Sequence, residues 1–228
     1  MRVLVAGATG AVGSALVPLL RESGFEATPH VRPQTARQHP LGNDPEALVC
    51  DLADSAAVDR GMTGCDAIAC LVGTMRNRFR AGDTYETSDY LPVVRLVESA
   101  RRVPSHGPRH FVLLSSLGAR PGSGYLGWKW FAEEAVRHSP LPWTILRPSF
   151  LDTRGSRSTP SHGKERRPPP LVGGLLSIVA WLPGVRGYAD ELRPMGVNVL
   201  CRAIVRIVRD HGPTGEVLTG RTLWQLGR

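Results

Sequence analysis

Tyr125 and Lys129 stand four residues apart in the segment Tyr-Leu-Gly-Trp-Lys, which places both side chains on one face if this segment is helical. An ammonium group beside a phenol favours the phenolate form. Such a tyrosine can donate a proton to a carbonyl oxygen as a hydride arrives, or accept one in the reverse reaction. Ser115 and Ser116, ten and nine residues upstream, could orient the substrate oxygen. The pattern predicts acid–base chemistry by Tyr125 and Lys129, with Ser116 or Ser115 as the third catalytic residue.

A glycine-rich turn follows the first apolar run of the chain. Gly7-Ala-Thr-Gly10-Ala-Val-Gly13 spaces its glycines by three residues, where a strand of residues 2–6 would end and a helix would begin. In such a turn the first glycine permits a tight bend, the second lets backbone amides approach a pyrophosphate, and the third lets the helix pack closely on the sheet. The positive end of the helix then faces the phosphates. The residues expected at the pyrophosphate are Gly7, Thr9, Gly10, Ala11, Val12 and Gly13. A glycine turn without a ligand is the alternative.

The end of the second expected strand bears on cofactor choice. It reads His30-Val31-Arg32, with no Asp or Glu nearby to bind a free ribose 2′-hydroxyl. A guanidinium group suits a 2′-phosphate, so NADP(H) is favoured over NAD(H), although in a chain this rich in arginine Arg32 could stand there by chance. Asp51, at the end of the third strand, is placed either to meet the adenine amino group or to cap a helix.

Strand-like and helix-like segments alternate along the chain, which predicts βαβ units and a doubly wound, Rossmann-like parallel sheet of the α/β class. We expect strands at 2–6, 25–31, 47–50, 67–72, 110–114, 143–146 and 216–219. We expect helices at 11–23, 55–62, 90–102, 128–138 and 197–209. Residues 1–150 would form the NAD(P)-binding core. Residues 151–228 would form a small C-terminal extension that completes the same domain and covers the substrate.

Several of these segments together resemble the atypical branch of the short-chain dehydrogenase/reductase superfamily. The similarity is to the small NAD(P)H-binding oxidoreductases grouped with the Tat-interactive tumour-suppressor protein, and to the neighbouring NmrA-like proteins. It covers residues 1–150 well and the remainder loosely. The segments that carry it are Gly7 to Gly13, Cys50 to Leu52, Cys70 to Thr74, Asp89-Tyr90, Phe111 to Ala119, Tyr125 to Lys129 and Ile145 to Pro148.

The resemblance implies that Ser, Tyr and Lys are catalytic and that the lysine also holds the nicotinamide ribose. It further implies cofactor contacts from Leu52, Val72, Gly73, Thr74, Ser115 and Pro148. Two departures stand out. The interval from Ser116 to Tyr125 is shorter than the family pattern, and the glycines at 122, 124 and 127 surround the tyrosine, so the helix could begin only after Tyr125.

The balance of 28 basic against 20 acidic residues gives a net charge of +8, which favours anionic ligands. The basic residues are dispersed and no nucleic-acid motif is present, so we expect a small-molecule substrate and no nucleic-acid partner. Residues 154–170 are basic and proline-rich, and would form a lid over the nicotinamide end or a disordered tether. The apolar stretch 171–183 is too short to span a bilayer, so no transmembrane segment is expected.

Four cysteines without a Cys-x-x-Cys pair indicate a reducing compartment, and we expect a cytoplasmic protein that is a monomer or homodimer. The sequence thus predicts an NADP(H)-dependent oxidoreductase that transfers a hydride to or from a carbonyl or alcohol substrate. The alternative is an NAD(P)H-sensing regulatory or assembly protein without catalysis, because some members of the group it resembles bind the cofactor mainly for regulation.

Overall fold

The computed structural model of the chain describes residues 1–73, 82–152, 191 and 193–228. Its centre is a parallel sheet of seven strands in the order β3-β2-β1-β4-β5-β6-β9. The strands are β1 (Arg2–Ala6), β2 (Glu26–Val31), β3 (Leu48–Val49), β4 (Ala67–Cys70), β5 (Phe111–Leu114), β6 (Trp143–Arg147) and β9 (Glu216–Thr219). The strand order reverses between β1 and β4, which is the switch point where open α/β sheets bind ligands. The predicted doubly wound Rossmann-like fold is confirmed.

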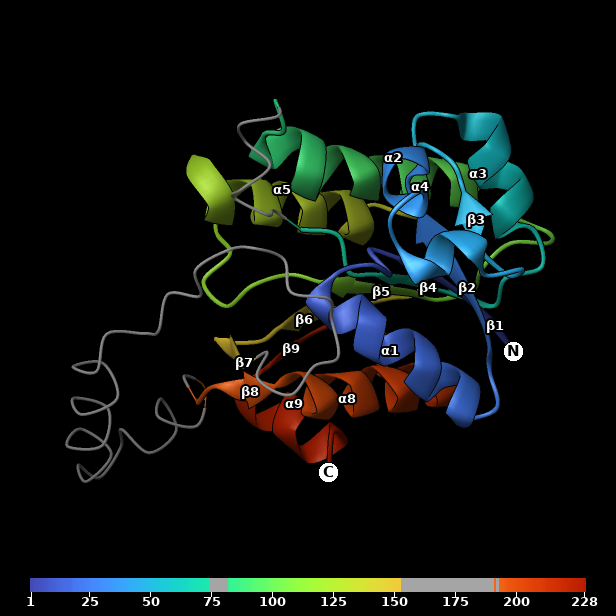
Figure 1. Cartoon of the computed structure of the whole chain (residues 1–228). Helices are drawn as coiled ribbons and strands as arrows, with labels where there is room; N and C mark the ends of the chain where they lie inside the picture. Colours follow the sequence, from blue (N-terminus) through green and yellow to red (C-terminus); the bar gives the residue numbers. More distant parts are fainter. Residues whose placement is uncertain (74–81, 153–190, 192) are drawn as a thin grey trace, which may run out of the picture.

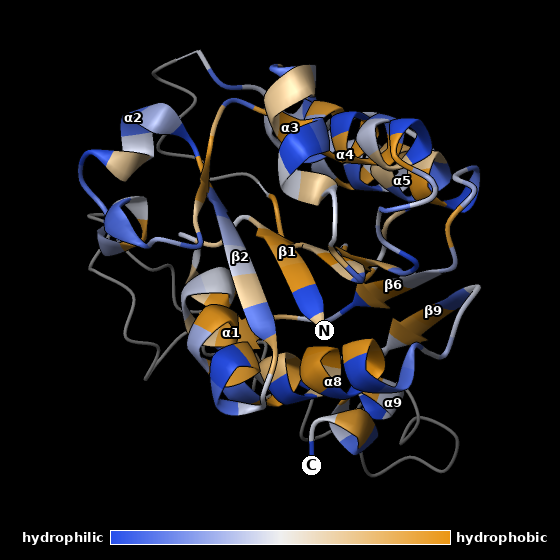
Figure 2. Cartoon of the chain, turned by 90° about the vertical axis from the view of Figure 1, so that its right-hand side faces the viewer, coloured by the Kyte–Doolittle hydropathy of each residue, from blue (hydrophilic) through white to orange (hydrophobic). Residues whose placement is uncertain are grey.

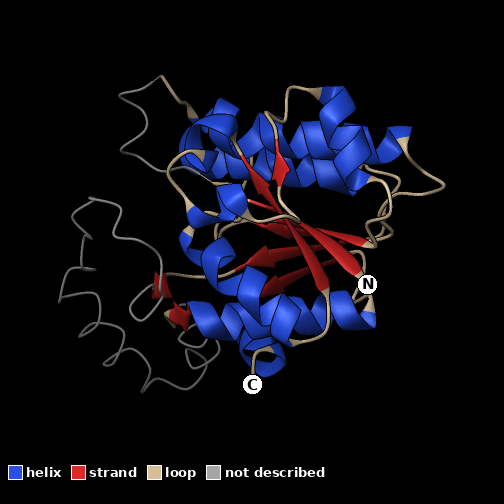
Figure 3. Cartoon of the chain, turned by 45° about the vertical axis from the view of Figure 1, so that its right-hand side comes forward, coloured by secondary structure: helices blue, strands red, loops and turns tan. Residues whose placement is uncertain are grey.

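Helices cover both faces of this sheet (Figures 1 and 3). One layer holds α3 (Ser55–Met62), α4 (Leu91–Arg102) and α5 (Gly124–Arg137), and the other holds α1 (Ala11–Glu22), α8 (Val197–Asp210) and α9 (Gly220–Leu226). The shorter elements are α2 (Pro33–Ala36), the 3-10 turn η1 (Pro40–Asn43) and a two-stranded ribbon of β7 (Leu151–Asp152) and β8 (Met195–Gly196). The sequence pattern did not indicate these short elements or α9.

The inner strands are buried on both faces, which is why they read as continuous apolar runs. In β1, Val3 and Val5 join the core on the α1 and α8 side, while Leu4 and Ala6 join the core under α3, α4 and α5. Figure 2 shows β1, β6 and β9 as mostly apolar strands between helices of mixed polarity. The sheet therefore separates two hydrophobic cores.

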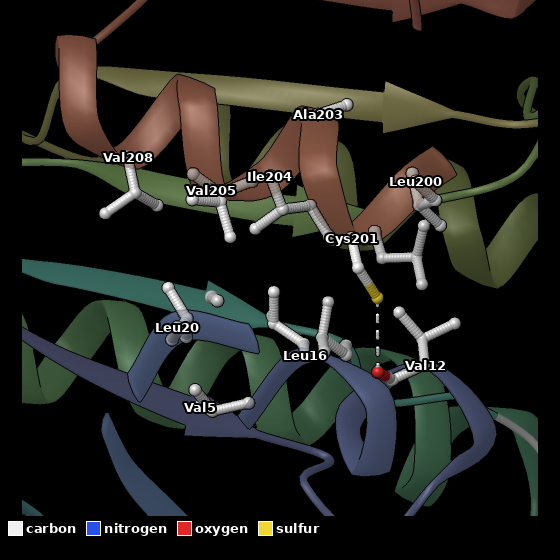
Figure 4. Close-up of a cluster of buried hydrophobic side chains, with 14 of the residues drawn as sticks. Val5, Val12, Leu16, Leu20, Leu200, Cys201, Ala203, Ile204, Val205 and Val208 are labelled. Atoms are coloured by element: carbon white, nitrogen blue, oxygen red, sulfur yellow. Dashed lines mark hydrogen bonds between the residues drawn. The ribbon is translucent and has the colours of Figure 1, made fainter. Parts of the chain in front are cut away.

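The contact between α1 and α8 joins the first and last parts of the chain (Figure 4). Leu16 and Leu20 of α1 face Ile204 and Val208 of α8, and all four side chains are fully buried. Apolar residues recur along α8 at helical spacing, so one complete face of that helix is covered. The helix that follows the glycine turn is thus held in place by residues from the C-terminal part.

Helix α5 begins at Gly124, so the prediction of a start at residue 128, after Tyr125, is wrong. The glycines that suggested a late start make the early one possible. Gly122 and Gly124 have φ values of +143° and +74°, which glycine adopts readily. A Cβ atom on Gly127 would lie 2.0 Å from the carbonyl oxygen of Gly122. The loop that leads into α5 can therefore pass this close to the helix only because residue 127 has no side chain. Tyr125 consequently lies in the first turn of α5.

A second difference precedes α4. The sequence predicted a helix from residue 90, whereas a π-helical turn, η3 (Glu86–Tyr90), comes first. The predicted lid at 154–170 and the apolar stretch 171–183 lie outside the described residues. Within the described part, none of the helices has the length and apolar character that crossing a membrane requires. All four cysteines are buried free thiols.

Candidate functional site

The glycine turn after β1 is built as the spacing predicts. Gly7 has φ +83°, and a Cβ atom there would lie 2.8 Å from the backbone of Leu71. The Gly10 amide donates to the Gly7 carbonyl at 3.1 Å, and Gly10 is the N-cap of α1. A Cβ atom on Gly13 would lie 2.3 Å from the Gly7 oxygen. The turn leaves the N-terminus of α1 at the switch point, with no acidic residue in its first turn, which suits a bound pyrophosphate.

The other residues expected at this turn differ in what their side chains do. Thr9 and Ala11 are partly exposed beside the N-terminus of α1. Val12 is 7% exposed, and its side chain packs against α8, so only its backbone is available to a ligand (Figure 4). Leu52 is likewise buried, in the core beneath α3 and α4.

The ends of β2 and β3 bring Arg32 and Asp51 to the same edge. His30 is buried between them, and its Nε2 lies 3.0 Å from the Cys50 carbonyl oxygen. Burial lowers the pKa of His30, with a smaller contribution from the Arg32 charge, so His30 stays neutral. Arg32 and Arg95, which lies 3.7 Å from Asp51 Oδ1, supply the positive charge of this corner. The cap of α3 is Asp54, which accepts from the Ala57 amide, so the capping alternative for Asp51 is wrong.

Lys129 is the most enclosed charged group of the site. It is 4% exposed, and its Nζ lies 3.0 Å from Asp89 Oδ1. The same ammonium donates to the carbonyl oxygens of Val72 at 3.0 Å and Leu114 at 3.3 Å. Its three hydrogens therefore have three acceptors, at the ends of β4 and β5 and on the turn before α4. Burial is the largest single influence and lowers the pKa of Lys129. The charge and hydrogen bond of Asp89, together with the nearby Tyr125 and Cys70 side chains, outweigh it, and the net direction is upward.

Gly73 passes directly over this ion pair. A Cβ atom at Gly73 would lie 3.5 Å from Lys129 Nζ and 3.6 Å from Asp89 Oδ1. The segment that follows β4 thus contacts the buried ion pair. It does so at the edge of the sheet where the glycine turn also lies. Thr74, the next residue expected to line the cofactor, lies outside the described residues.

Tyr125 lies on the same face of α5 as Lys129, as the spacing predicts. The Lys129 ammonium is 6.0 Å from the centroid of the Tyr125 ring. The Tyr85 ring packs at 5.8 Å from that of Tyr125, in a tilted arrangement. Tyr125 is half-buried.

The two candidate serines have different surroundings. Ser115 is buried, and its hydroxyl donates to Glu133 Oε1 at 2.5 Å. Glu133 is itself fully buried and accepts from Arg147 at 2.8 and 2.6 Å and from Arg137 at 3.1 Å. Ser116 is half-buried, and its hydroxyl has one long contact of 3.4 Å, to the carbonyl of Leu117. Of the two hydroxyl groups, that of Ser116 is the one not committed to a buried ion-pair network.

The segment after β6 lies beside the segment after β5. The Leu117 amide donates to the Pro148 carbonyl at 3.0 Å, which fixes Pro148 next to the two serines. The structure therefore brings together the glycine turn, Gly73, Lys129, Tyr125, the serines and Pro148 along one edge of the sheet.

The side chains that contact the predicted site residues were not themselves predicted from the sequence. Asp89 entered only as part of a motif, and its ion pair with Lys129 was not predicted. Glu133 and Tyr85 were not singled out at all. Asp89 lies in a polar stretch and Glu133 stands beside Glu134, so both look like carboxylates on a solvated surface.

Comparison with known proteins agrees with this geometry. A family model described as NAD(P)H-binding matches residues 7–170. The chloroplastic TIC 62 proteins of Arabidopsis thaliana and Oryza sativa subsp. japonica are 29% and 30% identical to the chain, over 66% and 92% of its length. The chain spans only 27% and 47% of those proteins. Sanguinarine reductase of Eschscholzia californica is 24% identical, with 68% of this chain and 71% of the reductase covered.

Among solved structures, a putative NAD-dependent epimerase/dehydratase from Bacillus halodurans superimposes with a TM-score of 0.66. The two chains are 20% identical, and the match covers 100% of this chain and 98% of the other. The likeness supports the Rossmann-like fold. With a family model matched over more than half of its residues, the chain belongs to the NAD(P)H-binding family.

Proposed function

We propose that the protein is an NADP(H)-dependent oxidoreductase that reduces a carbonyl group of a small molecule or oxidises the corresponding alcohol. The observation that carries the proposal is a phenol beside a buried, charged lysine, at the sheet edge that also holds the glycine turn. Two relatives are named as reductases, one of them an NAD(P)H azoreductase, which supports a reductive reaction with NAD(P)H.

In the reducing direction, the bound cofactor supplies the hydride to the carbonyl carbon. The Tyr125 hydroxyl donates its proton to the carbonyl oxygen, so the substrate leaves as an alcohol and the tyrosine remains as phenolate. Lys129 stabilises that phenolate with its positive charge. The Ser116 hydroxyl holds the substrate oxygen toward Tyr125, and Pro148 and Gly73 border the nicotinamide.

Asp89 has two opposing effects in this scheme. Its carboxylate keeps the buried lysine protonated, since an isolated ammonium in this environment would lose its proton. The same negative charge offsets part of the field that Lys129 exerts on Tyr125. We propose that Asp89 is a positioning residue that fixes the ammonium between the ends of β4 and β5.

We propose that Arg32 selects NADP(H) by contacting the 2′-phosphate, and that Asp51 meets the adenine from the end of β3. Gly7, Thr9, Gly10, Ala11, Val12 and Gly13 would hold the pyrophosphate through their backbone. We further propose a cytoplasmic location and a monomer or homodimer, with a small-molecule substrate and no nucleic-acid partner.

One observation favours a second function, a cofactor-sensing regulatory or assembly protein without turnover. All three hydrogens of the Lys129 ammonium already have acceptors within the chain, so holding a ribose hydroxyl would require the lysine to give up one of them. Under this alternative Lys129 and Asp89 stabilise the fold and Tyr125 transfers no proton.

Gly10→Asp is expected to abolish NADPH binding, because it places a carboxylate against the pyrophosphate. The fold should tolerate it, since a Cβ atom at Gly10 meets only the Gly7 oxygen, at 3.3 Å. The matched control is Gly196→Asp, at the N-cap of α8, where a Cβ atom has open space. The quenching of intrinsic fluorescence by added NADPH measures cofactor binding in both variants. Equal binding by wild type and Gly10→Asp would contradict the assignment of the turn.

Arg32→Ala is expected to weaken NADPH binding by about 1.5–3 kcal/mol, the scale of a hydrogen bond to a charged group, and to leave NADH nearly unchanged. Arg37→Ala, which removes an exposed arginine five residues away, serves as the control. Calorimetric titration with both cofactors provides the comparison. Tighter NADH than NADPH binding by the wild type would show that the proposed selectivity is wrong.

Tyr125→Phe is expected to lower kcat by about 10²–10⁴-fold, the usual contribution of general acid–base catalysis, with NADPH binding retained. The ring still packs, and only the titrating hydroxyl is lost. Tyr90→Phe, which keeps a ring that packs on Trp128, is the control. A screen of carbonyl compounds with NADPH identifies the substrate on which both are measured. If the wild type reduces none of them and Tyr125→Phe changes nothing but affinity for a protein partner, the regulatory function is the correct one.

Lys129→Met is expected to lower the free energy of unfolding by about 3–5 kcal/mol, because it leaves the Asp89 carboxylate buried without its partner. Asp89→Asn combined with Lys129→Met should recover most of that loss, since no charge then remains uncompensated. Urea unfolding of Lys129→Met, Asp89→Asn and the double variant at pH 7 tests the pair. Additive losses in the double variant would mean that the two side chains contribute independently.

A further inference from the structure

A small cavity lies away from the site described above, between α9 and the residues that lead into β8. It has a volume of about 220 Å³ and is lined by Arg193, Arg221, Trp224, Gln225 and Arg228. Three of these five lining side chains are exposed arginines, and none of the five is an acidic side chain. The cavity therefore concentrates positive charge on the α1 and α8 layer of the molecule, while α5, which carries Tyr125, belongs to the opposite layer (Figure 1).

The walls of this cavity are held by defined contacts. The Arg193 guanidinium lies 4.6 Å over the Trp224 ring, a cation–π arrangement that orients both side chains. The Arg193 carbonyl accepts from the Ser149 hydroxyl at 2.6 Å, which ties it to the segment after β6. Leu223 anchors α9 in the core, and Arg202 donates to the carbonyl of Gly227 at 2.6 Å. These contacts position Arg193 and Trp224, whereas the side chains of Arg221 and Arg228 are exposed at the mouth of the cavity.

The chemistry of the lining favours an anion. Guanidinium groups present paired N–H donors that match the geometry of phosphate and carboxylate oxygens. Arg193 and Arg228 form no ion pair with a carboxylate in the described part of the chain. The buried indole Nε1 of Trp224 also has no acceptor among the described residues. A buried donor of this kind costs free energy until an acceptor reaches it.

We propose that this cavity binds a phosphate monoester, through the dianionic phosphate of a small phosphorylated molecule. Its volume is below the ~300–1,000 Å³ typical of pockets that enclose a drug-sized ligand, so it fits the phosphate and a few further atoms. Three guanidinium groups match a dianion better than a single carboxylate. The site is separate from the pyrophosphate turn, because its lining contains no residue of that turn or of α1.

Glycerol 3-phosphate is a suitable probe, with glycerol as its uncharged counterpart. Calorimetric titration at 150 mM salt should show saturable binding of the phosphate ester and none of glycerol. Arg193→Gln and Arg221→Gln should each weaken that binding by about tenfold or more, the scale of losing a charge-assisted contact. Arg206→Gln removes an equal charge from an exposed position on α8 outside the cavity, and should leave the affinity within twofold of wild type.

Three outcomes would overturn the proposal. The first is equal affinity in wild type, Arg193→Gln and Arg221→Gln. The second is the same loss in Arg206→Gln, which would mean that only the overall charge attracts the ester. The third is loss of ester binding in the presence of saturating NADPH or in Gly10→Asp, which would place the phosphate at the glycine turn. Should Arg193→Gln not fold by circular dichroism, the exposed Arg221→Gln supplies the same comparison.

Discussion

The edge of the sheet at the site depends on one enclosed ammonium group. Lys129 reaches from α5 to the carbonyl oxygens at the ends of β4 and β5 and to the Asp89 carboxylate on the π-helical turn. The ammonium can connect α5, the ends of β4 and β5 and the π-helical turn because it offers three donors on a long flexible stem. The positions of Gly73, Tyr125 and the turn before α4 all follow from where this group is held.

Burying an ammonium group costs free energy, and this cost explains why an anion and two carbonyl oxygens surround Lys129. Removing a lysine from water disfavours its charged form, so a buried lysine without an anion tends to become neutral. Asp89 compensates this with its own charge, and the two backbone carbonyls satisfy the remaining hydrogens. A similar solution recurs nearby, where the buried Glu133 carboxylate is matched by Arg147 and Arg137 and takes the hydroxyl of Ser115. Of the predicted catalytic hydroxyl groups, those of Ser116 and Tyr125 stay outside these buried ion-pair networks.

Local patterns in the sequence were sufficient for the fold and for the outline of the site. The glycine spacing from Gly7 to Gly13 has one steric solution, and the structure adopts it. The four-residue interval between Tyr125 and Lys129 similarly forces the two side chains onto one helix face. The expected strands and longer helices are present, with their ends shifted by a few residues.

What could not be predicted depends on contacts between distant segments. Asp89 and Lys129 are 40 residues apart in sequence, and nothing near Asp89 indicates that its partner is a lysine. The glycines around Tyr125 pointed to a late helix start because glycine is a poor helix former. Their actual role is to let two segments cross, which becomes visible only when the Gly122 carbonyl is seen against Gly127. The short ribbon of β7 and β8 pairs residues on either side of a segment more than 40 residues long.

The pairing of β9 with β6 and the packing of α8 on α1 have a consequence for how the chain is made. During synthesis, the strands and helices up to residue 147 emerge from the ribosome before the segments that complete their sheet and cover α1. Until α8 follows, Leu16 and Leu20 of α1 have the apolar side chains of the sheet on one side but lack those of α8. Domains generally fold as units, and surface left open at this stage is prone to aggregation. The nascent N-terminal part is therefore expected to be a client for chaperones, although it contains the whole glycine turn.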